Sequence, residues 1–221
     1  MREYDPDKPL IFIHVPKTGG VSVRQVVDSW YPHRFSHYFS PKTGMPPRRD
    51  LSQRCADGSM PVVYGHFNRL RGFGIEQYYP EATQFITILR DPLETRISAY
   101  HYLKSLGDKL APDRRPQGTL EEFLISGPVG MLNYFPVEMT EANYKDVIES
   151  SFIEVGILEA LPESMRRIAA RLSKPFDESQ LPHLNRAVRF EGVSGEAKKK
   201  HKEINGLAYR VYDYVAARYS Q

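Results

Sequence analysis

An apolar run that ends in Pro-Lys-Thr-Gly-Gly constrains the fold of this chain more than any other stretch. Residues 10–15 are mostly apolar and rich in β-branched side chains, which is typical of a short strand buried on both faces. From Gly20 the apolar residues recur at helical spacing until Pro32 ends the pattern. The sequence therefore predicts a buried strand, a tight turn over residues 16–20 and a helix.

The same succession of strand and helix recurs along the chain. Further strands are predicted at residues 61–64, 84–89 and 152–158, and the last two lead into helical patterns. Residues 31–60 show little periodicity and are interpreted as a long functional loop or an irregular insertion. Apolar spacing from Ile204 to Val215 predicts a C-terminal amphipathic helix. Repeated strand–helix units predict an α/β fold with a central, mainly parallel sheet flanked by helices.

Composition limits the class of protein. The chain has 221 residues, of which 41% are hydrophobic, enough for one sizeable core. A formal charge of +3 is too small for the basic footprint of a nucleic-acid binder. Cys55 is the single cysteine, which excludes an intrachain disulfide and a cysteine-based zinc site. The charged N-terminus and the lack of a long apolar stretch lead us to expect a soluble, cytoplasmic protein.

The turn between the first strand and its helix has the chemistry of an anion site. Ligands of parallel sheets bind outside the carboxyl ends of the strands, and the first strand-to-helix turn commonly holds phosphate. Helix N–H groups point there, and Gly19 and Gly20 let an anion approach the backbone. Lys17 adds a full charge, while Thr18 and Ser22 add hydroxyl donors. These residues predict a cradle for a phosphate-like group.

Other interpretations of the same string stay open at this point. A Pro-Lys-Thr-Gly-Gly string can be no more than a tight turn with an exposed lysine. It also differs from a Walker loop, G-x-x-x-x-G-K-[ST], because here the lysine precedes the glycines. The residue order therefore disfavours a kinase-type site but does not choose between a plain turn and an anion cradle.

A second strand end adds a second cation. Arg90 follows the predicted strand at residues 84–89, and Asp91, Pro92 and Glu94 match the first positions of a well-capped helix. Asp91 is therefore assigned a structural role as the cap. Arg90 lies just outside the helix at the strand's carboxyl end, where its fork of donors can bind a second phosphate.

Three motifs in this order resemble a known family. They are the strand with Pro-Lys-Thr-Gly-Gly-x-Ser, the segment Tyr64–Phe67, and the strand followed by Arg90–Tyr102. Together they are similar to sulfotransferases that use 3′-phosphoadenosine 5′-phosphosulfate (PAPS), closest to carbohydrate enzymes of the heparan sulfate 2-O-sulfotransferase type. The likeness is detailed over residues 10–104 and fainter beyond. It implies a single sulfotransferase domain over residues 1–221 with a fold like that of P-loop NTPases.

The resemblance also implies roles for single residues. Those implied to hold the 5′-phosphosulfate are Lys17, Thr18, Gly19, Gly20 and Ser22. Those implied to hold the 3′-phosphate and the nucleotide are Arg90, Ser98, Asn185 and Arg186. PAPS is then the sulfuryl donor and the 3′,5′-bisphosphate PAP is the product, with no metal required. Two positions depart from the family: Val21 replaces a common threonine, and Tyr64 stands where the animal 2-O enzymes have a second histidine.

His66 is the base that the resemblance implies. A hydroxyl that attacks sulfur must lose its proton, and imidazole titrates close enough to neutrality to accept it. Lys17 would both hold the phosphosulfate and neutralise charge on the departing oxygen. The acceptor is expected to be a glycan or glycoside. The basic and aromatic loop residues that could face it are Arg34, Lys42, Arg48, Arg49, Arg54, Arg69, Arg71, Tyr31, Phe35, Tyr38 and Phe39.

Two alternative functions belong to other classes. The first is a P-loop kinase or NTPase in which Asp91 would hold magnesium, which requires a lysine on the unusual side of the glycines. The second is a non-enzymatic module that binds an anionic polymer through loop arginines. The near-balanced charge and the lack of an RNA-recognition motif argue against this second alternative.

Overall fold

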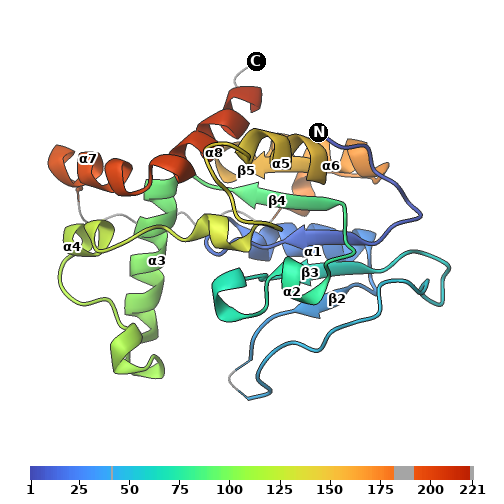
Figure 1. The fold of residues 1–221 in the computed structure, drawn as a ribbon, viewed down its shortest axis with the longest axis horizontal. Helices are drawn as coiled ribbons and strands as arrows, with labels where there is room; N and C mark the ends of the chain where they lie inside the picture. The colour runs from blue at the N-terminus through green and yellow to red at the C-terminus, as the bar shows by residue number, and fades with distance from the viewer. Residues whose placement is uncertain (41, 182–191, 220–221) are drawn as a thin grey trace.

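The computed structural model describes residues 1–40, 42–181 and 192–219, which form a five-stranded sheet flanked by helices (Figure 1). The strands are β1 (Leu10–Ile13), β2 (Phe35–His37), β3 (Val62–Gly65), β4 (Phe85–Leu89) and β5 (Phe152–Ile157). Their order in the sheet is β2-β3-β1-β4-β5, and all four pairings are parallel. The α/β class and the parallel sheet predicted from the sequence are confirmed.

Helices cover both faces of the sheet. They are α1 (Gly20–Trp30), α2 (Ile75–Tyr78), α3 (Pro92–Leu106), α4 (Leu120–Ile125), α5 (Tyr144–Ser151), α6 (Leu161–Leu172), α7 (Gly195–Ile204) and α8 (Gly206–Ala216). The apolar stripes of α1 and α6 pack with one set of strand side chains, and those of α5 and α8 pack with the other set. Because β1, β4 and β5 are buried on both faces, they consist of nearly continuous apolar runs.

The structure corrects two sequence predictions. The segment 31–60, expected to be irregular, contains the strand β2, which pairs along one side with β3. Three residues at a sheet edge are too few to give a readable alternation. The predicted C-terminal helix is in fact two helices that meet at Asn205, and Ile204, expected on the apolar face, is 44% exposed.

A group of helices stands at the carboxyl ends of the strands. The helix α3 leaves the end of β4 and packs with α4 and α7, through a small core that includes Ile97, Tyr100 and Leu124 (Figure 1). The helix α3 faces the turn that follows β1, since the ring of Tyr102 lies 4.2 Å from Nζ of Lys17. The ligand-binding edge of the sheet is therefore bordered by α3.

Within the described residues, no helix is both long and apolar enough to cross a bilayer.

Candidate functional site

The turn after β1 holds its lysine in an unusual conformation. Lys17 has φ of 68°, in the left-handed region that side chains other than glycine seldom adopt, and Gly19 has φ of 79°. The buried hydroxyl of Thr18 donates to the carbonyl of Val15 at 2.8 Å and ties the turn to the strand end. Strained non-glycine residues cluster at binding sites, so this backbone is a structural sign of function.

The first turn of α1 is left open to an anion. Gly19 is its N-cap, no side chain caps the helix, and no acidic residue occupies the first turn. By contrast, α3 has Asp91 as a cap and Glu94 in its first turn. Helix N–H groups without a protein partner, at the positive end of the dipole, attract phosphate and sulfate groups. Within the described residues, the N-terminus of α1 thus has no capping side chain, whereas that of α3 is already capped by Asp91.

Arg90 joins the two predicted anion-binding segments. It follows β4, which lies beside β1, and its Nη1 donates to the carbonyl of Lys17 at 3.3 Å. Its Nη2 lies 3.3 Å from a carboxylate oxygen of Glu94. Burial, and secondarily the charge of Arg90, lower the pKa of Lys17. Two cations at adjacent strand ends therefore adjoin, an arrangement that an anionic ligand would stabilise.

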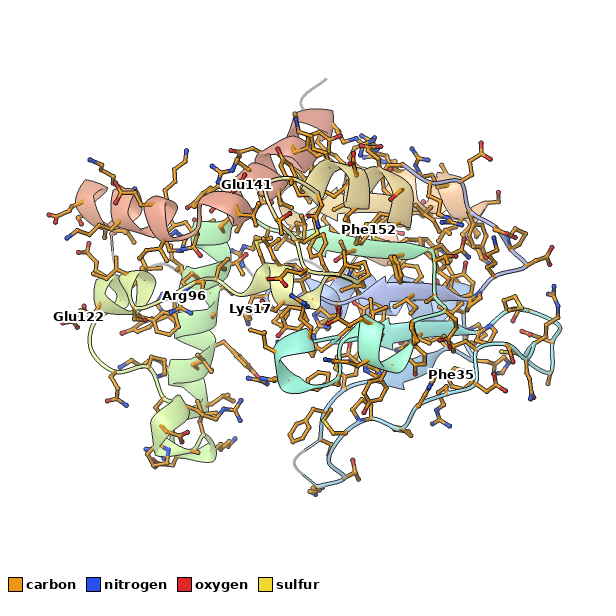
Figure 2. All side chains as sticks on the ribbon, viewed as in Figure 1. Lys17, Phe35, Arg96, Glu122, Glu141 and Phe152 are labelled. Atoms are coloured by element: carbon orange, nitrogen blue, oxygen red, sulfur yellow. The ribbon has the colours of Figure 1, made fainter. Side chains whose placement is uncertain are left out.

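One face of α3 borders this pair of cations. Glu94, Ser98 and Tyr102 are spaced by four residues and therefore share a face. Glu94 contacts Arg90, and the ring of Tyr102 lies 4.2 Å from Nζ of Lys17, which places Ser98 on the face toward the turn. Figure 2 shows Lys17 beside α3 and Arg96 on that helix. The guanidinium of Arg96 donates to the carbonyl of Phe123 in α4.

The imidazole of His66 has a defined tautomer. Its Nδ1 lies 2.6 Å from the carbonyl oxygen of His14, which can only accept, so Nδ1 carries the proton and Nε2 of the neutral ring has the free lone pair. Burial lowers the pKa of His66, an effect that the hydrogen bond to His14 opposes. A neutral ring with an unprotonated Nε2 is the form that a general base requires.

Aromatic rings surround His66 because of the strand register. Tyr64 of β3 pairs with Phe12 of β1 and Ser36 of β2. Two residues further along each segment, just past the strand ends, come His66, His14 and Tyr38. Side chains alternate along strands, so these three lie on one face of the sheet. The ring centroids of His14 and His66 are 4.3 Å apart and stacked, and the Tyr38 ring meets His66 edge-on at 4.8 Å. Sequence reasoning singled out Tyr38 as an acceptor contact but missed His14.

Ion pairs take up several basic side chains that were expected to face an acidic acceptor. The pairs are Arg34–Asp28, Arg48–Glu81, Arg54–Asp7 and Arg69–Glu76. The positive charge that acts on the histidines comes from elsewhere: Arg71 contributes to lowering the pKa of His66, and Arg24 contributes to lowering that of His14. Arg71 was among the expected residues, whereas Arg24 was not.

Other predicted site residues differ in how far the structure describes them. Asn185 and Arg186 lie outside the described residues. The predicted cap is confirmed, because Oδ1 of Asp91 accepts from the N–H of Glu94 at 2.9 Å. Across residues 1–40, 42–181 and 192–219, no cluster of three or more His, Cys, Asp or Glu side chains is placed to hold a metal ion.

No family model and no curated protein matches the chain. Solved structures similar to it include two that were determined with PAP. One is the mouse sulfotransferase SULT7A1 complexed with PAP, matched over 80% of this chain and 62% of that one, with 16% identity and a TM-score of 0.47. The other is retinol dehydratase in complex with androsterone and inactive cofactor PAP, matched over 95% and 71%, with 15% identity and a TM-score of 0.41. The chain thus spans less than two thirds of the mouse enzyme's structure.

Proposed function

We propose that this chain is a PAPS-dependent sulfotransferase, formed as one domain over residues 1–221, which moves a sulfuryl group to a hydroxyl of a carbohydrate or similar acceptor. The observation that carries the proposal is the meeting of the Lys17 turn and Arg90 at adjacent strand ends, with Nη1 of Arg90 bonded to the carbonyl of Lys17. A nucleotide with a 5′-phosphosulfate and a 3′-phosphate needs two neighbouring cationic sites. The three motifs that resemble this family supply the same residues.

Each residue has a distinct part in the proposed reaction. The N-terminus of α1 and Lys17 hold the phosphosulfate, while Arg90 and Ser98 hold the 3′-phosphate. Nε2 of His66 takes the proton of the acceptor hydroxyl as the new O–S bond forms. The S–O bond to the nucleotide breaks at the same time, and its electron pair leaves on the phosphate oxygen of PAP. Lys17 stabilises the charge that develops on that oxygen.

The position of Asp91 argues against the kinase alternative. Magnesium at a carboxylate after β4 would compete with the hydrogen bond that Oδ1 of Asp91 accepts from the N–H of Glu94. The main-chain N–H of Asp91 is also held, by a carboxylate oxygen of Glu159 at 3.0 Å. Asp91 therefore stabilises the start of α3, the helix that carries Ser98 and begins just after Arg90.

The first test is a thermal-shift titration with PAP, run beside ATP with magnesium. A site saturated a hundredfold above its Kd adds about 2.7 kcal/mol, which for a chain of this size raises Tm by roughly 5–11 °C. We expect this shift with PAP, its loss in Arg90→Ala, and its retention in Arg48→Ala, which removes an arginine from a surface ion pair. A shift with magnesium-ATP but not with PAP would refute the proposal in favour of a kinase.

The second test identifies the acceptor. Labelled PAPS is incubated with the protein and a panel of neutral and acidic oligosaccharides and small glycosides, and transfer of the label is measured. We expect transfer to at least one sugar hydroxyl and no transfer by Lys17→Ala. PAP binding without transfer to any sugar would contradict the carbohydrate acceptor while leaving the donor site in place.

A further inference from the structure

The side chain of His14 contacts His66, Tyr38 and the first turn of α1. Its ring stacks on His66, its Nδ1 lies 3.0 Å from the hydroxyl of Tyr38, and its carbonyl accepts the Nδ1 proton of His66. A Cβ atom at Gly20 would stand 1.8 Å from its Nε2, so the ring packs directly against the first turn of α1. His14 therefore connects His66 to the helix that is proposed to hold the donor.

We propose that His14 is a positioning residue for His66: its carbonyl selects the tautomer, and its ring, held between Tyr38 and Gly20, fixes the plane of the imidazole. Nε2 of His66 is then the nitrogen presented to the acceptor hydroxyl. This inference rests on the proposed function, because it assigns to His14 a task in the same reaction.

The geometry requires both parts of His14. The carbonyl alone would let the His66 ring turn out of its hydrogen bond, whereas the His14 ring, stacked with a centroid distance of 4.3 Å, holds it there. The two ring planes are inclined by 28° and are stacked. Tyr38 in turn prevents the His14 ring from turning, since its hydroxyl bonds Nδ1 and its ring meets the His14 ring edge-on.

The charged and titratable groups around the pair favour the neutral form. Besides Tyr38, His66 is approached by Tyr134, from the turn of 3-10 helix over Met131–Tyr134, and by Arg71. His37, at the end of β2, also interacts with it. Burial, and secondarily nearby positive charges, lower the pKa of His14 to about 3. Because both pKa values are lowered, both rings are neutral at neutral pH, and Nε2 of His66 is unprotonated and can take the proton of the acceptor hydroxyl.

The experiment uses nitrogen-15 NMR of the histidine side chains in the full chain, without a ligand. In the wild type we expect His66 to be protonated at Nδ1 and to titrate below the usual range. His14→Ala removes the ring but keeps the carbonyl; we expect mixed tautomers and a higher pKa for His66. His14→Phe restores a stacking ring and should return His66 to nearly the wild-type tautomer.

The chain offers a matched control. His201 in α7 is also buried and bonded to a tyrosine hydroxyl, that of Tyr209 at 3.1 Å, but it does not contact His66. His201→Ala should destabilise the protein while leaving the tautomer and the pKa of His66 unchanged. Because this control also loses a buried imidazole, it separates positioning of His66 from general loss of stability.

The catalytic consequence is measured with water as the acceptor, as release of labelled sulfate from PAPS. We expect His14→Ala to lower this rate about 10- to 100-fold, the usual effect of a misplaced catalytic group, without changing the Tm shift given by PAP. An unchanged His66 tautomer and pKa in His14→Ala would overturn the inference. If the wild type gives no Tm shift with PAP, the proposed sulfotransferase function fails, whatever the NMR result.

Discussion

Substitution of Gly20 by alanine tests the packing on which the histidine pair depends. The added Cβ would lie 1.8–2.3 Å from Nε2, Cδ2 and Cε1 of His14, far closer than atoms can approach. The main chain at Gly20 cannot yield readily, because the hydroxyl of Tyr64 donates to its carbonyl at 2.8 Å. The His14 ring must therefore leave its place between α1 and His66.

The expected loss of stability follows from the contacts that the ring would give up. Loss of the hydrogen bond to Tyr38 costs about 1 kcal/mol, and loss of the stacked ring pair costs about the same. Overpacking adds about 1 kcal/mol or more, while alanine in a helix is more favourable than glycine by about 1 kcal/mol. The net destabilisation is about 2 kcal/mol, which lowers Tm by roughly 4–8 °C for a protein of this size.

The assay compares two glycines at the same helix position. Gly195 is the first residue of α7, as Gly20 is of α1, and a Cβ there would meet no atom of the described residues within 4 Å. Urea and thermal unfolding should show Gly20→Ala destabilised and Gly195→Ala neutral or slightly stabilised. Removing the ring as well, in Gly20→Ala with His14→Ala, should recover part of the loss. Equal stability of the two single variants would refute the reasoning.

Two further predictions concern the donor site and acid stability. Ser98→Ala should weaken PAP binding about tenfold by calorimetry, because it removes a hydrogen bond to a charged group. The control is Ser105→Ala on the same helix, whose hydroxyl donates to the carbonyl of Tyr102, and it should leave the affinity unchanged. Equal affinities of the two variants would contradict the role of Ser98. Burial lowers the pKa of His37 to about 4, so the unfolded chain binds more protons between about pH 6.5 and pH 4 and stability should fall as the pH drops through that window. His37→Phe should flatten this slope of Tm against pH, and an unchanged slope would contradict the assignment.

The strands that could be predicted from the sequence are those that carry their own signal. Strands β1, β4 and β5 are nearly continuous apolar runs, and the start of α3 has both its cap and its proline in the sequence. The edge strand β2 exists only through its pairing with β3. The division between α7 and α8 is hidden because Ile204 and Leu207 continue a helical spacing across Asn205.

The candidate site divides in the same way. The turn with Lys17 and the segment that begins at Arg90 are local motifs, so their place at strand ends follows from the sequence. The partners of His66 are distant in the sequence and adjacent only through the register of three strands. His14 and Tyr38 flank His66. Sequence reasoning could have found this only from the strand order, together with the alternation of residues 10, 12 and 14 beside residues 62, 64 and 66.

The left-handed backbone at Lys17 has a consequence for how this chain can change. Glycine adopts φ of 68° without steric cost, so Lys17→Gly should stabilise the free protein by up to about 1 kcal/mol. The same change removes the cation proposed to meet the donor. Selection for thermal stability alone would therefore favour glycine at this position. Variants selected for activity should instead retain lysine, and the stability that glycine would have added is the cost of that function.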